Sequence, residues 1–480
     1  MTSAKTAAGD HPTTIGVLSP QQIIDAALAA STADGCIIVV QSSTEANVRW
    51  ANNTVTTNGL TSTLSWFVVC VVGGAAGTVA ASAASADSAR SVAEVVAAAH
   101  AAAKAAAHSG PAQDEQPLVQ PDGDPSADFD AAPVPTSFGV FTELIDSLAT
   151  AFDDARASDR ILYGFARHEM TTVHLGSSTG IRRRWVQPTG LLEVNAKSAD
   201  LRRSAWAGLS TADFRGVDLG TVTGDLAQRL EWAKRTVDLP AGRYDTVLPP
   251  TAVADFILYL FWSAGARPAH EGRSAFSAPG GGTLVGQRLT NRPMTLFSDP
   301  TAPGLESAPF VVASSSSDDV SVFDNGAPIG RCELLTDGVI SNLLHTRGSA
   351  AEFSEPFVPP TDNLVLTGGS PGRTLDDLVA GVRRGLLVTS QWYLREVDPM
   401  TMLLTGLTRD GVFLVEDGEI AGAVTNFRFN MSPLDVLRQA SDIGGTVPAL
   451  SREWSDWFTR AAMPPMVVEG FNMSSVSKAQ

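Results

Sequence analysis

The chain has 480 residues and a formal net charge of −17. This charge argues against a general nucleic-acid-binding protein, because binding to phosphate backbones depends on clustered lysine and arginine. Hydrophobic residues make up 44% of the chain and charged residues 18%, so a large core can be buried and disorder of the whole chain is excluded. At roughly 100 to 200 residues per domain, the length suggests about two to four folding units.

The three cysteines, Cys36, Cys70 and Cys332, lie far apart and form no CxxC pair. This spacing argues against a disulfide framework or a structural zinc knuckle, and it favours a reducing, cytoplasmic location. Residues 1–20 are polar, so no signal peptide is predicted.

Residues 66–86 carry no charge and are long enough to resemble a membrane span. However, they contain a β-branched run at 67–72 followed by the turn pair Gly73-Gly74, which predicts a buried hairpin and no membrane segment. Just before them, Asn58-Gly59 lies between two threonine-rich stretches and is typical of a turn between strands.

The first half of the chain predicts a helix–strands–helix pattern that occurs twice. The first pattern comprises a helix at 21–30, strands near 36–41, 47–51 and 60–72, and an alanine-rich helix at 87–107. The second comprises a helix at 142–157, short strands within 161–208, and a helix at 224–237 with a buried stripe of Leu226, Leu230, Ala233 and Val237. Between the patterns, residues 109–135 hold six prolines and six acidic residues but no lysine or arginine, which predicts a flexible, poorly ordered segment.

The second half of the chain is predicted to be rich in β-structure. Residues 251–263 are apolar around the whole helical circumference, which predicts a helix buried inside the protein. Two further helices are predicted to start at Thr374 and Ser432, and hairpins are predicted at 324–326, 337–338, 410–411 and 417–418. The fold class is therefore predicted as α+β, with an N-terminal α/β domain at 1–240, including the flexible segment 109–135, and a β-rich domain at 241–480.

Several candidate catalytic motifs fail on physical grounds. Ser370 lies in a GxSxG string, but Pro371 follows it and has no N–H to offer an oxyanion hole. Ser178 lies in a second such string at a predicted hairpin tip instead of a strand-to-helix elbow. His168 and His174 stand six residues apart on a predicted strand, which places them roughly 20 Å apart and too far to share one metal ion.

Residues 182–184 are three consecutive arginines on a predicted strand. Alternation places Arg182 and Arg184 on one face and Arg183 on the other. Two interpretations stay open, a solvated strand and an arginine ladder that meets an acidic partner or peptide.

His270-Glu271 is the pair with the most chemical interest. A zinc peptidase of the HExxH type needs a second histidine one turn along the same helix, so that both imidazoles face one ion while the glutamate activates water. Ser274 and Ala275 stand one turn on instead, and only Cys332 and His345 follow as histidine or cysteine further along the chain. A pair without a third ligand is expected to hold zinc weakly.

Several stretches together resemble the TldD/PmbA family, once labelled modulators of DNA gyrase. The resemblance covers nearly the whole chain and rests on GSSTGIRRR at 176–184, QPTG at 187–190, VNAK at 194–197, SAWAG at 204–208, AHEGRSAFS at 269–277, DNGAPIG at 324–330 and GG at 368–369. It implies an N-terminal α/β region followed by a β-rich domain.

In that family, the TldD-type subunit carries a HExxxH motif and a late cysteine that complete a peptidase zinc site. The TldE/PmbA-type subunit lacks them and pairs with TldD in a cytoplasmic heterodimer that degrades unfolded peptides and trims modified peptide precursors. This sequence has Ala275 at the second histidine and no cysteine after Cys332, so it resembles the metal-free subunit. The resemblance implies no metal in this chain, zinc in a HExxxH-bearing partner and peptide substrates, with His270 and Glu271 as vestigial candidates.

Three hypotheses remain open. The favoured one is a non-catalytic subunit of a TldD/TldE-like zinc metallopeptidase, with neither nucleic acid nor membrane as a partner. The second is a homodimeric metallopeptidase that uses His270, Glu271 and an unrecognised ligand. The third is a stand-alone peptide-binding module.

Overall fold

The structure is a computed structural model that describes residues 16–409 and 411–477. The chain divides into two compact units, which are described one at a time. Unit 1 contains the described residues up to Ser42 together with Thr63–Pro133 and Thr172–Trp185; unit 2 contains Ser43–Ser62, Val134–Thr171 and the described residues from Val186 onward. The domain boundary predicted at residue 240 stays a prediction, because this division follows spatial contacts and not chain order.

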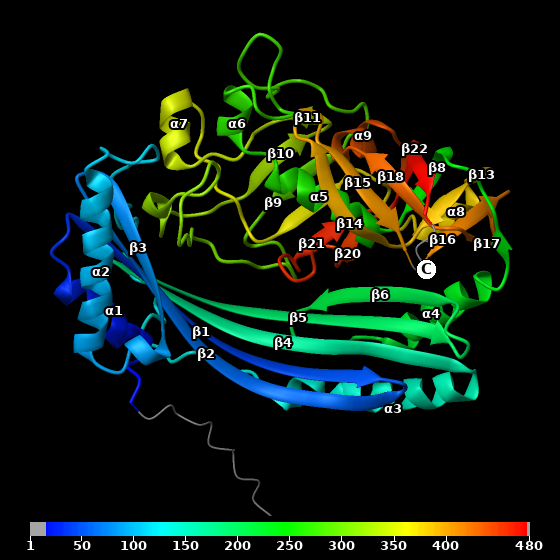
Figure 1. The fold of residues 1–480 in the computed structure, drawn as a ribbon, viewed down its shortest axis with the longest axis horizontal. Helices are drawn as coiled ribbons and strands as arrows, with labels where there is room; N and C mark the ends of the chain where they lie inside the picture. Colours follow the sequence, from blue (N-terminus) through cyan, green and yellow to red (C-terminus); the bar gives the residue numbers. More distant parts are fainter. Residues whose placement is uncertain (1–15, 410, 478–480) are drawn as a thin grey trace, which may run out of the picture. The chain divides into compact units, whose positions relative to one another are not determined.

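A six-stranded sheet runs in the order β3-β2-β1-β4-β5-β6, and four of its strands pass from one unit into the other (Figure 1). Its strands are β1 (Gly35–Ala51), β2 (Thr54–Val72), β3 (Ala75–Ser82), β4 (Arg160–Ser177), β5 (Arg182–Ser198) and β6 (Ser204–Thr211). The short strands predicted near 36–41 and 47–51 belong to one continuous strand, β1, and the region 161–208 contains the long strands β4 and β5.

Unit 1 is built on helices α1 (Pro20–Ala30) and α2 (Ala89–Ala107), as predicted. Ser19 and Gln22 form a capping box that starts α1, and the Ser88 side chain caps α2. Apolar side chains of both helices pack in one cluster with side chains of β1 and β2, among them Ile23, Ile38, Val68, Val92 and Val96.

The uncharged stretch at 66–86 forms the predicted buried hairpin. β2 and β3 pair antiparallel, with Val72 opposite Ala75. Gly73 and Gly74 make the turn with positive φ angles of 57° and 77°, which glycine adopts without steric cost. In the described part of the chain, no helix is long and apolar enough to cross a membrane.

The turn predicted at Asn58-Gly59 is wrong, because β2 runs through both residues without interruption. The chain reverses instead at Asn52 and Asn53, between the end of β1 and the start of β2. Both residues have positive φ angles, of 53° and 56°. Asparagine tolerates this left-handed conformation better than most residues, so two asparagines can form a hairpin turn without glycine.

Residues 109–135 contain no helix or strand, in keeping with their composition. They are nevertheless tied to unit 1 by hydrogen bonds: Ala112 N donates to Gly74 O, and the Thr179 hydroxyl donates to Val119 O at 2.7 Å. The segment is a loop with specific contacts, and its predicted flexibility stays a prediction.

In unit 2, helices α3 (Thr142–Ala157) and α4 (Leu219–Trp232) share a core with strands of the first sheet. α3 has the predicted bounds. α4 starts earlier than predicted because the Asp218 carboxylate accepts a hydrogen bond from Thr221 N and caps the helix. It also ends earlier, so Val237 lies in a strand and does not continue the buried stripe of the helix.

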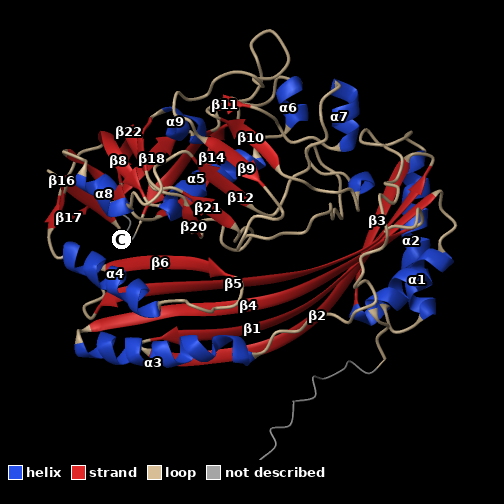
Figure 2. Cartoon of the chain, turned by 180° about the vertical axis from the view of Figure 1, so that it is seen from behind, coloured by secondary structure: helices blue, strands red, loops and turns tan. Residues whose placement is uncertain are grey.

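The rest of unit 2 contains two sheets, a six-stranded one in the order β11-β10-β9-β12-β21-β20 and a ten-stranded one in the order β14-β15-β18-β22-β8-β13-β16-β17-β7, with β19 beside β22. The strands are β7 (Thr236–Val237), β8 (Gly242–Leu248), β9 (Thr295–Ser298), β10 (Cys332–Thr336), β11 (Val339–Ile340), β12 (Leu364–Thr367), β13 (Arg384–Val388), β14 (Gln391–Asp398), β15 (Leu403–Thr408), β16 (Val412–Glu416), β17 (Glu419–Val424), β18 (Phe427–Met431), β19 (Ala440–Ile443), β20 (Val447–Ala449), β21 (Ala461–Met463) and β22 (Met466–Val476). The helices are α5 (Pro250–Trp262), α6 (Ala266–His270), α7 (Arg347–Phe353), α8 (Leu375–Ala380) and α9 (Pro433–Arg438) (Figure 2). The α+β class is confirmed.

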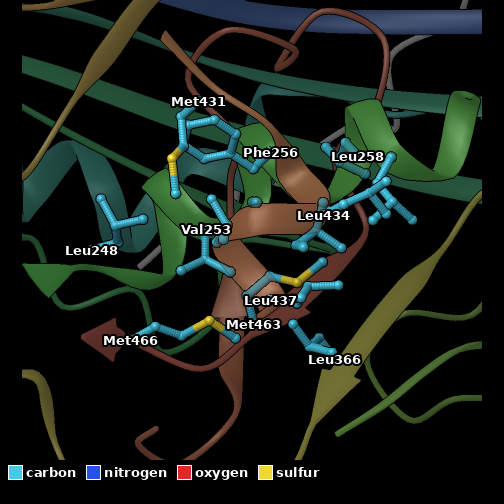
Figure 3. Packing of buried hydrophobic residues seen from close by; sticks show 14 of the residues in the cluster. Leu248, Val253, Phe256, Leu258, Leu366, Met431, Leu434, Leu437, Met463 and Met466 are labelled. Carbon is cyan, nitrogen blue, oxygen red and sulfur yellow. The ribbon is translucent and has the colours of Figure 1, made fainter. Parts of the chain in front are cut away.

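Helix α5 is the predicted buried helix, and it contributes to the largest core cluster of the chain. Its side chains Val253, Phe256 and Leu258 lie among residues of α9 and of both C-terminal sheets (Figure 3). The Phe256 ring packs 5.8 Å from the ring of Phe429 and 5.9 Å from that of Phe471, measured between centroids.

Two of the four predicted C-terminal hairpins are confirmed. Residues 337–338 join β10 to β11, and residues 417–418 join β16 to β17. The hairpin predicted at 324–326 is wrong, because the chain forms a single 3-10 turn there. The buried Asn325 side chain accepts a hydrogen bond from Ala313 N and donates one to Ala313 O, as the backbone of a neighbouring strand would. The hairpin at 410–411 is also wrong, because β15 and β16 are not neighbours in the sheet; Asp410 itself lies outside the described residues. The helices predicted from Thr374 and Ser432 are confirmed as α8 and α9.

Phe256 tests the packing around α5. We expect Phe256→Ala to lower the free energy of unfolding by about 3–5 kcal/mol, since it leaves a cavity among aromatic rings. Urea denaturation followed by fluorescence measures this change. Val285→Ala, at an exposed valine, serves as the control and should change stability by less than about 0.5 kcal/mol. A Phe256→Ala variant as stable as that control would contradict close packing at this position.

Candidate functional site

His270 is the last residue of the short helix α6, and Glu271 follows as its C-cap. Gly272 then has a positive φ of 73°, so the chain leaves the helical path directly after the pair. Ala275 consequently does not lie one turn further along α6. The helix that a HExxxH motif requires is not formed here, independently of which residue stands at position 275.

The structure brings a second imidazole to His270 from a distant part of the sequence. The His345 ring lies 6.2 Å from the His270 ring, measured between centroids. His270 also stacks on Phe353 at 3.9 Å with the two rings nearly parallel, and the His345 ring lies 6.5 Å from that of Phe353. His345 is buried, and its Nδ1 lies 3.1 Å from the hydroxyl oxygen of Ser349. We refer to His270 and His345 as the histidine pair.

The environment of the pair favours the neutral form of His345. Burial is the main cause that lowers the pKa of His345 to about 4, and its electrostatic interactions with His270 and Arg267 act in the same direction. His345 is therefore neutral at pH 7. The Nε2 atom of His270 is buried and has no hydrogen-bond partner among the described residues.

The Glu271 carboxylate is paired with two arginines, which makes it a poor catalytic base. Its carboxylate accepts a hydrogen bond from Arg273 Nε at 2.9 Å and lies 3.5 Å from Arg267 Nη1. The hydrogen bond from Arg273 and the positive charges of both arginines hold the pKa of Glu271 below its usual range. Arg267 in turn forms a 2.5 Å ion pair with Glu352. A carboxylate in such a network is a poor acceptor for a proton from water.

Helix α7 supplies the other half of the site. Glu352 and Phe353 follow Ser349 by three and four residues, so each lies on the same helix face as Ser349. Each contacts one residue of the site: Ser349 contacts His345, Glu352 contacts Arg267, and Phe353 contacts His270. The sequence analysis did not predict this helix. Its only local signal is Thr346, which caps the helix by accepting a hydrogen bond from Ser349 N.

The residues present do not fit a catalytic zinc ion. Such an ion takes three protein ligands and leaves a fourth position open. Here two imidazoles lie together, the adjacent carboxylate is paired with arginines, and the buried Arg267 places a positive charge beside them. Within residues 16–409 and 411–477, no group of three histidine, cysteine, aspartate or glutamate side chains could hold a metal ion.

The remaining candidates have structural roles. His168 is buried and hydrogen-bonded to Thr136 and to Ala212 O. His174 is buried beside Gln21, and burial lowers its pKa to about 4. Ser178 accepts a hydrogen bond from Cys36 N at the tip that joins β4 to β5.

The arginine run meets acidic residues of its own chain. Arg182 lies 3.8 Å from the Asp25 carboxylate on α1, while Arg183 and Arg184 form ion pairs with Asp122 and Asp128. Both of these aspartates belong to the acidic loop at 109–135. The carboxylates that these arginines meet in the structure therefore belong to the same chain, one on α1 and two in this loop.

The low pKa of His345 gives a testable pH dependence. In the unfolded chain the His345 side chain takes up a proton near pH 6.5, whereas in the folded chain its pKa is about 4. The unfolded state therefore binds more protons between these two pH values, and the free energy of unfolding falls as the pH is lowered through this window. We expect His345→Gln to remove about 2 kcal/mol of the stability difference between pH 7 and pH 5, measured by urea denaturation at both values. Equal pH dependence in His345→Gln and the wild type would refute a neutral buried His345.

The chain was compared with known protein families and structures. The PmbA/TldA metallopeptidase C-terminal domain matches residues 241–475, and the PmbA/TldA metallopeptidase domain 1 matches residues 36–106. A comparison with curated proteins found no match.

Three solved structures share the fold over nearly the whole of both chains. TldE from Thermococcus kodakarensis has 16% sequence identity and a TM-score of 0.74, covering 94% of this chain and 99% of its own. A protein of Thermotoga maritima described as a candidate modulator of a DNA gyrase has 15% identity and a TM-score of 0.72, with coverage of 94% and 99%. A similarly described protein of Bacteroides thetaiotaomicron has 13% identity and a TM-score of 0.72, with coverage of 95% and 98%. The two matched domains span well over half of the residues, and the chain therefore belongs to the PmbA/TldD metallopeptidase family.

Proposed function

We propose that this chain is the non-catalytic subunit of a heterodimeric zinc metallopeptidase that acts on unfolded or modified peptides. The observation that carries the proposal is the donor set at the family motif. It consists of two imidazoles beside Arg267, and the pairing of Glu271 with Arg267 and Arg273 removes the base that water activation needs. The fold shared with TldE of Thermococcus kodakarensis supports the same assignment.

In this proposal a HExxxH-bearing subunit of the same family supplies the zinc ion and the activated water. The present chain closes a shared chamber and holds extended peptides against exposed strand edges. Pairing through backbone groups suits a peptidase that tolerates many sequences, because every residue offers the same N–H and C=O groups. We also propose a cytoplasmic location, in which the three free cysteines remain reduced.

One observation favours the alternative of a metallopeptidase active in its own right. The buried Nε2 atom of His270 lacks a hydrogen-bond partner in the described part of the chain, and a ligand could satisfy it. Metal analysis distinguishes the two proposals. The chain purified alone should contain far less than one zinc per molecule, whereas stoichiometric zinc that disappears in His270→Ala would support the alternative.

Activity provides the direct test. The chain is expressed alone, and together with the HExxxH-bearing family member of the same organism, and each preparation is incubated with an unfolded casein substrate. We expect cleavage only in the co-expressed preparation, and we expect the two chains to purify as a complex. Cleavage by this chain alone, or a partner that never co-purifies, would contradict the proposal.

Restoring the missing histidine should not restore the site. In Ala275→His the new imidazole follows Gly272, where the chain has already left the helix, so it cannot face His270 from the next turn. We expect the zinc content of Ala275→His to stay as low as that of the wild type, measured by atomic emission on purified protein. One zinc per molecule, lost again in the double variant Ala275→His/His270→Ala, would show that the backbone is already arranged for a metal.

A further inference from the structure

Three tryptophans lie close together, Trp262 at the end of α5 and Trp454 and Trp457 on the loop before β21. Tyr393 of β14 is linked to the same loop by its backbone N–H, which donates to the Glu453 carboxylate. We refer to these four residues as the aromatic patch. Trp454 lies between its neighbours, with ring centroids 5.3 Å from Trp262 and 6.3 Å from Trp457. Trp457 is 73% exposed and Tyr393 is 55% exposed. Of the four exposed aromatic side chains in the described residues, only Phe138 lies outside the patch.

The loop that carries Trp454 and Trp457 is fixed from inside the protein. The buried Asp255 of α5 accepts a hydrogen bond from the Ser451 hydroxyl at 2.5 Å and another from Glu453 N at 3.1 Å. The Trp454 indole donates to Asp255 O at 2.8 Å. The exposure of Trp457 therefore does not reflect a loose loop. A large apolar side chain on an ordered loop loses little conformational freedom when it is bound.

The backbone at Tyr393 is strained. Its φ of +56° lies in the left-handed region, which is unfavourable for a bulky side chain. The Glu453 carboxylate holds this conformation by accepting hydrogen bonds from Tyr393 N at 3.0 Å and from Leu394 N at 3.2 Å. Strain kept at an exposed aromatic residue, with a buried network to maintain it, is typical of a functional surface.

We infer that the aromatic patch is the surface on which the HExxxH-bearing subunit docks. This inference rests on the proposed function and adds the location of the interface. Exposed apolar clusters on folded proteins mark interaction sites, and tryptophan and tyrosine are the side chains that contribute most to binding at such sites. The partner is expected to offer an apolar pocket that receives Trp457.

Two observations favour a folded subunit over other occupants. β14 is the terminal strand of its sheet, but Glu453 already occupies the N–H groups of Tyr393 and Leu394, so an extended peptide cannot pair with the strand there. A second copy of this chain would carry the same net charge of −17 over its whole sequence, and like net charges oppose association.

The test measures the dissociation constant for the purified HExxxH-bearing family member of the same organism by titration calorimetry. We expect Trp457→Ala to raise this constant tenfold or more, since an anchor residue at the centre of an interface is lost. Tyr393→Gly should also raise it, yet it should not lower the Tm, because glycine relieves the strain at φ +56°.

Leu201→Gly is the matched control. Leu201 is 57% exposed and has a φ of +61°, so this variant removes an exposed apolar side chain and the same kind of strain outside the patch. It should keep the Tm and leave the dissociation constant unchanged. Wild-type affinity in both Trp457→Ala and Tyr393→Gly would overturn the docking surface while leaving the proposed function intact.

Two further outcomes are distinguishable. A wild-type chain that binds no HExxxH-bearing subunit would remove the proposed function, and the docking surface with it. A wild-type chain that forms dimers with itself, and loses them in Trp457→Ala, would assign the patch to a second copy and overturn the partner named here. Sedimentation velocity of each chain alone measures this second outcome.

Discussion

Apart from Asp255, the buried side chains of helix α5 are apolar and lie on every side of it, so the helix can be stable in water only when other elements surround it. Strands of both C-terminal sheets and helix α9 provide that cover. At its carboxyl end the chain continues through Ala264 and Gly265 into α6, which carries His270. From its middle, Asp255 anchors the loop that presents Trp457. The histidine pair and the aromatic patch are therefore both positioned by one buried helix.

The sequence predicted the elements whose signals are local. The apolar spacing within 21–30, the capping residues at Thr374 and the turn at Gly73-Gly74 each lie in or next to the element that they form. Elements that depend on distant contacts were not predictable in this way. Asn325, for example, lies in a sequence typical of a hairpin turn, but it ends a 3-10 turn and its amide bonds the backbone of Ala313, twelve residues away.

The candidate site was predictable only in part. Arg267 precedes Glu271 by four residues and Arg273 follows it by two, so the pairing that neutralises this carboxylate could have been read from local spacing. The second imidazole could not, because His345 reaches His270 only through the tertiary fold. Phe353 and Glu352 belong to a seven-residue helix with a glycine in its first turn, which is too short for a clear hydrophobic period.

The ion pairs between the arginine run and the acidic loop have a consequence for selectivity. In an acidic protein, Arg182, Arg183 and Arg184 would otherwise attract nucleic acids and acidic peptides. Two of them are instead paired with carboxylates of the same chain, so that their binding is intramolecular. An external polyanion must displace these tethered carboxylates before it can bind, so weak anionic ligands are excluded by competition within the molecule.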